Sequence, residues 1–228
     1  MKRQSMSRGD ITKQTLITTA IEIFGRDGFH AASTREIAAQ AQVNQASIGY
    51  HFGGKDALYL AAIKYIADQI AERMEPIASE IAKEVEMLDG EDPGQSTTRE
   101  HYVSLLIRLI DALLRMLVDQ KSSAWAKLIL REQQTPSEAF DVFYEGLMGK
   151  VFRLTAYLVG RIRNIEPQSE EARLLAITLF GQAIVFRASR AAVLRYMGWS
   201  DFSGKDVAAI QIQLRTNIRA MFNLGEPL

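Results

Sequence analysis

Apolar residues recur every three or four positions along most of this chain, which is the spacing that places them on one face of an α-helix. No stretch of useful length alternates apolar and polar residues as a β-strand does. The sequence therefore predicts an all-α protein of about nine helices. The expected helices cover residues 11–26, 33–41, 45–52, 55–87, 98–119, 122–133, 136–164, 168–197 and 204–224.

Capping residues and helix breakers set the predicted boundaries, because the free backbone groups at helix ends need partners. Asp10 is expected to be the N-cap of the first helix, and Gly28 is expected to end it. Pro76 is expected to kink the long helix, and Asp89–Ser96 to form a loop. Thr135 and Pro136 are expected to be the cap and first residue of a later helix, and Ser203 the cap of the last helix.

Two short predicted helices precede the long helix that begins at Lys55. Ser33 and Glu36 have the spacing of a capping box, in which each side chain bonds the other residue's backbone amide. Asn44 is placed to cap the next helix, and Gly53 and Gly54 end it after about two turns. Two short helices joined by a tight turn are typical of a helix-turn-helix DNA-binding domain.

The second short helix presents small or hydrogen-bonding side chains on its outer face. Such side chains suit a helix in the major groove of DNA, where base edges offer donors and acceptors. Lys55, in the first turn of the long helix, faces the positive end of that helix dipole, and a bound phosphate would offset the conflict. We expect DNA contacts from Ser33, Thr34, Gln45, Ala46, Ser47, Gly49, Tyr50, His51 and Lys55.

The roles of these residues divide between positioning and base reading. Thr34, Tyr50 and Lys55 are expected to meet phosphates, while Gln45, Ser47 and the backbone of Gly49 are expected to face bases. The N-terminal arm, with Lys2, Arg3 and Arg8, is a further candidate for minor-groove or phosphate contact.

Residues 10–60 resemble the signature of the TetR/AcrR family of bacterial transcriptional regulators. The resemblance rests on Phe24, Gly28, Thr34, Ile37, Ala38, Ala41, Val43, Ile48, Tyr50, His51, Phe52, Lys55 and Leu58. It implies an all-helical homodimer with a three-helix DNA-binding domain, here residues 1–54, and a larger effector-binding and dimerisation domain, here residues 55–228. It also implies a repressor on a pseudo-palindromic DNA operator, released when a small-molecule effector moves the helix over residues 55–87.

The chain departs from the family pattern at two positions. Many members have glycine where this chain has Gln42, at a turn that favours positive φ. Many have an aromatic residue where this chain has Gly49, which lowers helix propensity and removes a side-chain contact. The segments Val43–Gly53, Arg131–Gln133 and Thr135–Ser137 are similar to a branch of the family that controls multidrug efflux genes.

The stretch from Leu174 to Phe186 is the most apolar in the chain, so its helix must be covered on nearly every side. A second copy of the chain is the simplest cover, although a core helix within one subunit is the alternative. The predicted dimer interface is Leu175, Leu179, Gln182, Ala183 and Phe186, and the candidate effector pocket is Tyr102, Met116, Trp125 and Arg187. Packing in the core and ion pairing are the alternatives for the pocket residues.

Charge and composition are compatible with this interpretation without requiring it. The 228 residues carry 27 basic and 27 acidic side chains, but residues 1–64 hold eight basic and five acidic ones. Cysteine is absent, which excludes disulfides, thiolate metal sites and a cysteine nucleophile. The start of the chain lacks the apolar region of a signal peptide and no segment is apolar enough to span a membrane, so we expect a cytoplasmic protein.

Enzyme chemistry is not expected. The stretch Gly49–Asp56 resembles a phosphate-binding loop, but it follows a predicted helix and places Asp56 where a hydroxyl should bind magnesium. The three histidines lack metal-ligand spacing, so the sequence predicts no metal, cofactor or catalytic residue. The competing hypothesis is a helical small-molecule-binding protein or enzyme whose DNA-binding head is vestigial.

Overall fold

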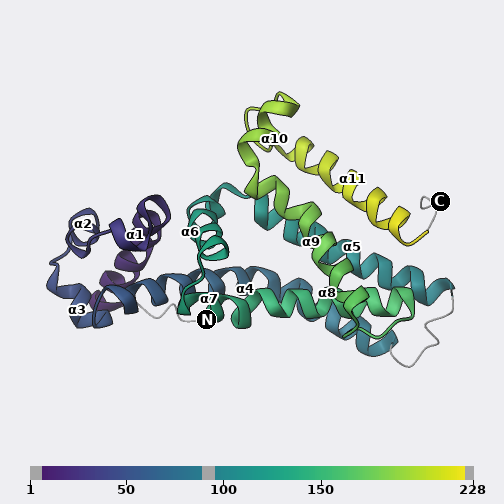
Figure 1. Cartoon of the computed structure of the whole chain (residues 1–228), viewed down its shortest axis with the longest axis horizontal. Coiled ribbons are helices and arrows are strands. Elements are labelled where there is room, and N and C mark those ends of the chain that lie inside the picture. The colour runs from purple at the N-terminus through teal and green to yellow at the C-terminus, as the bar shows by residue number, and fades with distance from the viewer. Residues whose placement is uncertain (1–6, 89–95, 224–228) are drawn as a thin grey trace. The chain divides into compact units, whose positions relative to one another are not determined.

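A computed structural model describes residues 7–88 and 96–223 of the chain, and all regular structure within them is helical (Figure 1). The fold is therefore all-α, as predicted. The helices are α1 (Arg8–Ala31), α2 (Thr34–Gln40), α3 (Ala46–Phe52), α4 (Lys55–Leu88), α5 (Ser96–Val118), the 3₁₀ turn η1 (Gln120–Ser122), α6 (Ser123–Gln134), α7 (Glu138–Phe143), the π-helical turn η2 (Tyr144–Met148), α8 (Gly149–Arg163), α9 (Glu170–Ala188), α10 (Arg190–Met197) and α11 (Gly204–Met221).

The chain forms two compact units, each made of two segments. The N-terminal unit joins Met1–Gln69 to Ser123–Leu147, and the C-terminal unit joins Ile70–Ser122 to Met148–Leu228. The N-terminal unit thus contains α1–α3, the first half of α4, and also α6 and α7. The predicted boundary between a DNA-binding domain (residues 1–54) and an effector-binding domain (residues 55–228) stays a prediction, because these two units describe packing and not binding.

The N-terminal unit is built around α1. Its apolar face, including Leu16, Ile21 and Phe24, is buried, and α1 packs against both α2 and α6. Leu58 and Ile63 of α4 are also fully buried. This apolar core holds α2 and α3 at fixed positions and leaves their polar sides exposed.

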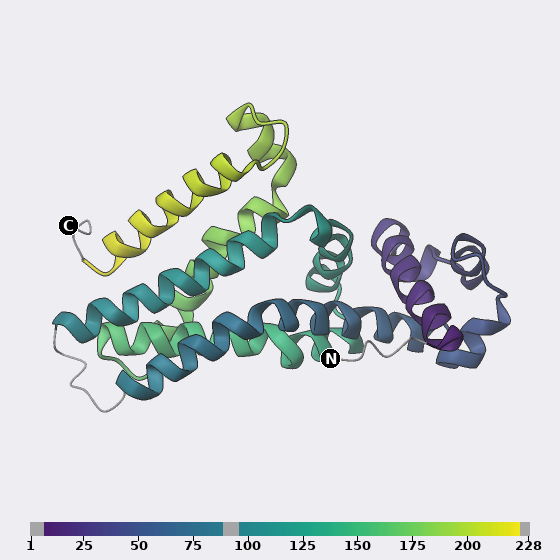
Figure 2. The ribbon, with the colours of Figure 1, turned by 180° about the vertical axis from the view of Figure 1, so that it is seen from behind.

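The C-terminal unit is organised around α5, which packs against α8, α9 and α11. Figures 1 and 2 show α5, α8 and α9 running side by side, with α11 next to α5. Tyr102, Leu105 and Leu109 on α5 are buried in this core. The carboxylate of Asp111, also buried, accepts hydrogen bonds from Arg215 and so joins α5 to α11.

Two of the predicted helices are each divided in the structure. The predicted helix over residues 136–164 is interrupted by the π-helical turn η2 between α7 and α8. The predicted helix over residues 168–197 ends at Ala188, and α10 leaves α9 at an angle of 78° because Ser189 has non-helical dihedral angles. These breaks depend on tertiary packing, which the apolar period does not encode.

Several predicted boundaries need correction. Ser7 is the N-cap of α1, and Asp10 is the third residue of the helix, which completes a capping box with Ser7. The cap of α7 is Ser137, which accepts a hydrogen bond from the Ala139 amide, and not Thr135. Gly28 has a φ of 82°, as expected of a helix stop, but the chain resumes helical turns up to Ala31. The predicted loop at Asp89–Ser96 lies outside the described residues except for Ser96, which begins α5.

No single helix in the described part of the chain is long and apolar enough to cross a membrane. Within those residues, only the bent pair α9 and α10, taken together, has the length and apolar composition of a membrane span.

Glu84 of α4 gives the C-terminal unit a predicted acid sensitivity. Its carboxylate accepts hydrogen bonds from His101 and Arg108 of α5, at 2.9 Å and 2.5 Å, and these two bonds hold the pKa of Glu84 below its usual range. A depressed pKa stabilises the fold above the unfolded-state value of about 4.3, and the contribution disappears as the pH falls below it. In urea titrations between pH 6 and pH 3, wild type should therefore lose more stability than Glu84→Gln.

Glu86→Gln is the matched control, since Glu86 lies exposed on the same helix. It should follow the wild-type pH profile. If the free energy of unfolding falls equally with pH in wild type and in Glu84→Gln, Glu84 is not the source of the acid sensitivity.

Candidate nucleic-acid interface

The start of α2 shows how local sequence sets the geometry of the interface. Ser33 is the N-cap, and its hydroxyl accepts from the Glu36 amide at 3.1 Å, as predicted. The predicted return bond from Glu36 is not made, because the Glu36 carboxylate instead pairs with Arg26 of α1 at 2.5 Å. This ion pair ties the beginning of α2 to α1, but both side chains are exposed, so its contribution to stability is small.

The turn between α2 and α3 depends on a residue in a left-handed conformation. Gln42 has a φ of 56°, the value that glycine adopts at least cost. The amide of Val43 donates to the Ala38 carbonyl at 3.0 Å and closes the turn. The N-cap position of α3 is Gln45, which makes no side-chain capping bond, and not the predicted Asn44. Asn44 lies one residue earlier, and its side chain accepts from the Ala46 amide at 2.8 Å at the start of the helix. Gln42 thus adopts the positive φ expected at this turn although it is not a glycine.

The outer face of α3 is polar and open. Gln45, Ala46 and Gly49 are exposed, and Tyr50 is 86% exposed. An aromatic side chain left this exposed loses the stabilisation of burial and is free to meet another molecule. A side chain added at Gly49 would meet nothing within 4 Å, so glycine is not required there by packing.

Hydrogen bonds and ring contacts orient the neighbours of this face. The Gln45 amide nitrogen donates to the hydroxyl of Thr34 at 3.2 Å, which couples α3 to the first turn of α2. The rings of Tyr50 and His51 meet edge to face, with centroids 4.9 Å apart. Ser47 and His51 are half-buried, so they present less surface than Gln45 and Tyr50.

Lys55 begins α4 and is held by the end of α1. Its ammonium donates to the His30 carbonyl at 3.3 Å and lies 4.6 Å from the centroid of the Phe29 ring. These contacts place the charge close to the interface but give it protein partners. The role of Lys55 as a phosphate anchor stays a prediction, as do the base and phosphate assignments of the other residues.

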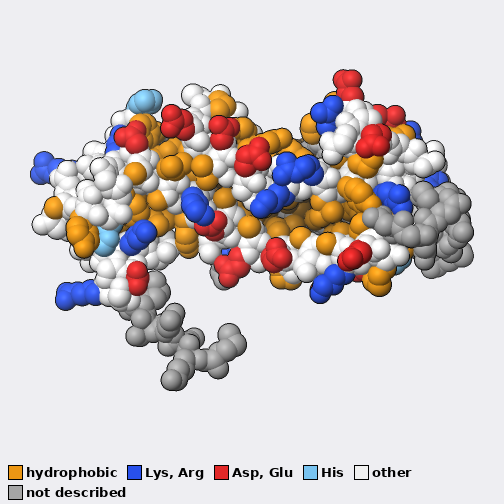
Figure 3. Space-filling view, turned by 90° about the horizontal axis from the view of Figure 1, so that it is seen from below, with side chains coloured by type: hydrophobic (Ala, Val, Ile, Leu, Met, Phe, Trp, Pro, Cys, Tyr) orange, Lys and Arg blue, Asp and Glu red, His pale blue; other side chains and the backbone are white. Residues whose placement is uncertain are grey.

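Charge distribution adds little to the definition of the interface. On the face drawn in Figure 3, Lys and Arg side chains lie interspersed with Asp and Glu and do not form one basic patch. Of the N-terminal arm, Lys2 and Arg3 lie outside the described residues, and Arg8 is exposed at the start of α1.

The sequence did not reveal how α6 is attached to the interface helices. The guanidinium of Arg131 donates to the carbonyls of Gly25 and Arg26 at 3.1 Å and 2.8 Å. The buried carboxylate of Glu132 accepts from the Tyr59 hydroxyl of α4 and from Ser137. Burial and this hydrogen bond raise the pKa of Tyr59. The resemblance over Arg131–Gln133 was the only sequence signal for these contacts.

The four candidate pocket residues occupy different units. Tyr102, Met116 and Arg187 belong to the C-terminal unit, whereas Trp125 belongs to the N-terminal unit. Arg187 is buried and donates to the carbonyls of Leu117 and Asp119 and to Ser122, so it satisfies backbone acceptors at the end of α5. These partners are neutral, so Arg187 makes hydrogen bonds to backbone carbonyls and a hydroxyl in place of the ion pair that was the alternative for it.

The apolar helix α9 divides its residues between the core and the surface. Leu179 and Ala183 are buried within the chain, so they have almost no surface to offer a second subunit. Leu175, Gln182 and Phe186 are half-buried and stay predicted interface residues. The exposed apolar positions of α9 are Leu174, Ile177 and Val185.

Comparisons with known proteins found matches to both the N-terminal and the C-terminal parts of the chain. Residues 16–62 match the family model described as bacterial regulatory proteins, tetR family, and residues 102–223 match the C-terminal domain of the HTH-type transcriptional dual regulator CecR. The chain is similar to the HTH-type transcriptional dual regulator CecR of Shigella flexneri, with 31% identity over 195 residues, 86% of this chain and 84% of that protein.

More distant relatives match in part or in fold alone. The HTH-type transcriptional regulator RutR of Escherichia coli strain K12 is 34% identical over 56 residues, 25% of this chain and 26% of RutR. A TetR-like transcriptional regulator from Rhodococcus sp. RHA1 superimposes with a TM-score of 0.62 and 22% identity, covering 95% of this chain and 98% of that structure. At this identity the structural likeness shows the fold.

The turn between α2 and α3 provides a test of local strain. Replacing Gln42 by glycine removes a left-handed penalty of about 1–2 kcal/mol but adds unfolded-state entropy worth about 0.5–1 kcal/mol. Because Gln42 is exposed and no packing is lost, Gln42→Gly should raise the free energy of unfolding by about 0.5–1 kcal/mol. Ala39→Gly, in the helical part of α2, should lower it by about 1 kcal/mol. Urea unfolding measures both, and a destabilised Gln42→Gly would refute the strain argument.

Proposed function

Because the chain belongs to the TetR family of bacterial regulatory proteins, we propose that it is a homodimeric repressor, released from a pseudo-palindromic operator by a small-molecule effector. TetR-family members are DNA-binding transcriptional regulators and not enzymes. The observation that carries the proposal is the polar face of α3, held by the Gln42 turn and exposed beside Thr34. A cytoplasmic location is part of the proposal.

The side chains on this face have different roles in the proposed complex. Gln45 and Ser47 read base edges in the major groove, together with the backbone of Gly49. Thr34, Tyr50 and Lys55 position the protein on phosphates, which carry no sequence information themselves. The bond from Gln45 to Thr34 at 3.2 Å supports this division, because a phosphate contact at Thr34 would also fix the orientation of Gln45.

Dimerisation is proposed through the outer faces of α9 and α11. Ile177 of α9 and Ile212 of α11 are 52% and 65% exposed. A hydrogen bond of 3.0 Å from Asn217 to Gln182 joins the two helices beside these residues. Exposed isoleucines on adjoining helices are typical of a surface that a second copy covers. A two-fold dimer would place two copies of α3 in successive major grooves, about 34 Å apart.

The effector is proposed to bind the larger, C-terminal unit, in which Tyr102 and Met116 remain candidate pocket residues. Since α4 runs without interruption from Lys55 to Leu88, it belongs to both units and is the element through which binding would act on the DNA-binding helices. Control of efflux or transport genes is the finer proposal and rests on the resemblance over Arg131–Gln133 and Thr135–Ser137.

A second candidate function is dual regulation, with activation at some promoters and repression at others. It is favoured by the description of the Shigella flexneri relative as a dual regulator. The alternative of a vestigial head in a small-molecule-binding protein differs in that it predicts no sequence-selective DNA binding.

The salt dependence of DNA binding distinguishes a phosphate contact by Lys55 from a loss of folding in the Lys55 variant. Lys55→Ala should weaken binding to all duplex sequences alike and reduce the slope of log K against log salt by about one unit. Lys64→Ala is the matched control, because Lys64 is an exposed lysine on the same helix that already pairs with Asp68. Fluorescence anisotropy over a range of salt concentrations measures both slopes. An unchanged slope in Lys55→Ala would remove Lys55 from the interface.

Base reading by Gln45 has a different signature. Gln45→Ala should relax specificity at one base pair in each half-site, with a loss of about 1–3 kcal/mol for the preferred base. Gln40→Ala, an exposed glutamine of α2, should leave specificity unchanged. Binding is measured against every single-base variant of the selected site. Uniform weakening across all variants would contradict direct readout.

The proposed dimer surface can be tested by introducing charge. Ile177→Glu should convert a dimer into monomers, because a buried carboxylate without a partner costs several kcal/mol. Ile11→Glu is the control, since Ile11 is 54% exposed but belongs to α1. Light scattering coupled to size-exclusion chromatography gives the mass. A dimer that persists in Ile177→Glu would exclude this face.

A further inference from the structure

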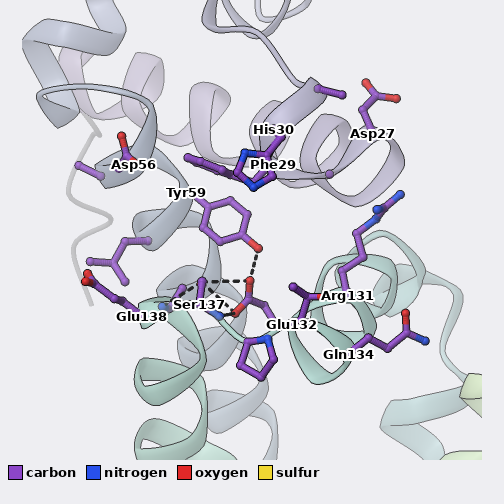
Figure 4. A pocket seen from close by; sticks show the side chains of 17 residues that line it. Asp27, Phe29, His30, Asp56, Tyr59, Arg131, Glu132, Gln134, Ser137 and Glu138 are labelled. Atoms are coloured by element: carbon purple, nitrogen blue, oxygen red, sulfur yellow. Dashed lines mark hydrogen bonds between the residues drawn. The ribbon is translucent and has the colours of Figure 1, made fainter.

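A groove of about 870 Å³ lies within the N-terminal unit, apart from the exposed face of α3 (Figure 4). Its walls come from the end of α1, the first turns of α4, and the turn that joins α6 to α7. This volume is within the range of about 300–1,000 Å³ that small-molecule sites occupy. All of its lining residues belong to one compact unit, so the groove is a property of that unit alone.

One wall of the groove is aromatic. The rings of Phe29 and Tyr59 meet edge to face, with centroids 5.1 Å apart, and Phe24 packs behind Tyr59 at 5.0 Å. The ammonium of Lys55 lies 4.6 Å from the centroid of Phe29 and occupies one side of that ring. Tyr59 is only 7% exposed and Phe29 is half-buried, so the apolar surface that this wall offers to a ligand comes mainly from Phe29.

The floor of the groove contains a buried carboxylate. Glu132 is 3% exposed and accepts hydrogen bonds from the Tyr59 hydroxyl and from Ser137, as Figure 4 shows. No ion pair with a Lys or Arg is found for Glu132 within the described residues. Hydrogen bonds from neutral groups satisfy the oxygens but leave the negative charge itself without a counter-charge.

The groove has two ends of different charge. At one end, Arg131 donates to the α1 carbonyls close to Asp27, which is itself paired with Arg26. At the other end, Asp56 and Glu138 are exposed, and neither has an ion-pair partner in the part of the chain that the structure describes. Figure 4 shows these two carboxylates on the side of Tyr59 opposite to Arg131. The unpaired end is therefore negative.

The arrangement of these carboxylates does not suit a metal ion. Among the described residues, no group of three or more His, Asp or Glu is close enough together to bind one. Apart from Asp27, which pairs with Arg26, the three acidic side chains of the groove come instead from α4, α6 and α7 and are distributed along an aromatic wall. Such a distribution fits a larger cation whose charge is attached to a flat apolar body.

We propose that this groove binds a small aromatic organic cation of the amidinium or ammonium class. The aromatic body of the ligand packs against the open part of Phe29, which the buried ring of Tyr59 supports. Its cationic group lies at the negative end, between Asp56 and Glu138, within the field of the Glu132 carboxylate. The site is separate from the effector site proposed for the C-terminal unit, and its occupation does not depend on DNA binding.

The test uses the full chain without DNA and benzamidine as the probe, with benzamide as its neutral counterpart of the same shape. A ligand that binds only the folded state raises the melting temperature in proportion to the logarithm of its concentration. Benzamidine should raise the melting temperature and bind in a saturable titration by calorimetry, whereas benzamide should do neither. An equal response to both compounds, or no response to benzamidine, would overturn the proposal.

Variants locate the bound probe. Asp56→Asn and Glu138→Gln should each weaken benzamidine binding by about three- to tenfold, since each removes one exposed charge and leaves the fold intact. Phe29→Ala should weaken it further by removing part of the aromatic wall. Asp141→Asn, an exposed carboxylate of α7 outside the groove, should bind like wild type. Benzamidine binding that is the same in Asp56→Asn, Glu138→Gln and wild type would place the probe elsewhere and refute the site.

Discussion

The N-terminal unit depends on two adjacent side chains of α6. Arg131 donates to backbone carbonyls of α1 just before the irregular residue Gly28, and Glu132 accepts from Tyr59 at the start of α4. A Cβ atom at Gly28 would lie 3.0 Å from the Arg131 guanidinium, so glycine meets both the positive φ and the close approach. Through these contacts a segment more than 70 residues away from α3 becomes part of the same compact unit.

This arrangement explains how a small head can present a short helix to DNA. The seven-residue helix α3 is too short to be stable alone, and only Ile48 of α3 is fully buried. Its position therefore depends on the turn at Gln42, the hydrogen bond from the Ala46 amide to Asn44 and the core formed by α1 and α4. The outer face of α3 takes no part in the core formed by α1 and α4, so side chains such as Tyr50 remain exposed without a loss of packing.

Features that depend on neighbouring residues were predictable from the sequence, and features that depend on distant ones were not. The Ser33 cap, the hydrogen bond from the Ala46 amide to Asn44 and the end of α3 at Gly53 follow from residues within three or four positions of each other. Glu36 has the spacing of a capping box, but Arg26 lies close in space and takes its carboxylate. The bend after α9 and the placement of Trp125 and Tyr102 in different compact units arise from tertiary packing, which the apolar periodicity of the sequence does not reveal.

The central claim is that this chain reads DNA sequence as a symmetric dimer. The most direct measurement is selection of duplexes from a random-sequence library by the full chain at physiological salt, followed by sequencing of the retained fraction. The account predicts one enriched motif with two-fold related half-sites whose centres lie about one helical turn, roughly 10 base pairs, or a multiple of that distance apart. A retained fraction with no enriched sequence, or with a single unrepeated half-site, would contradict it.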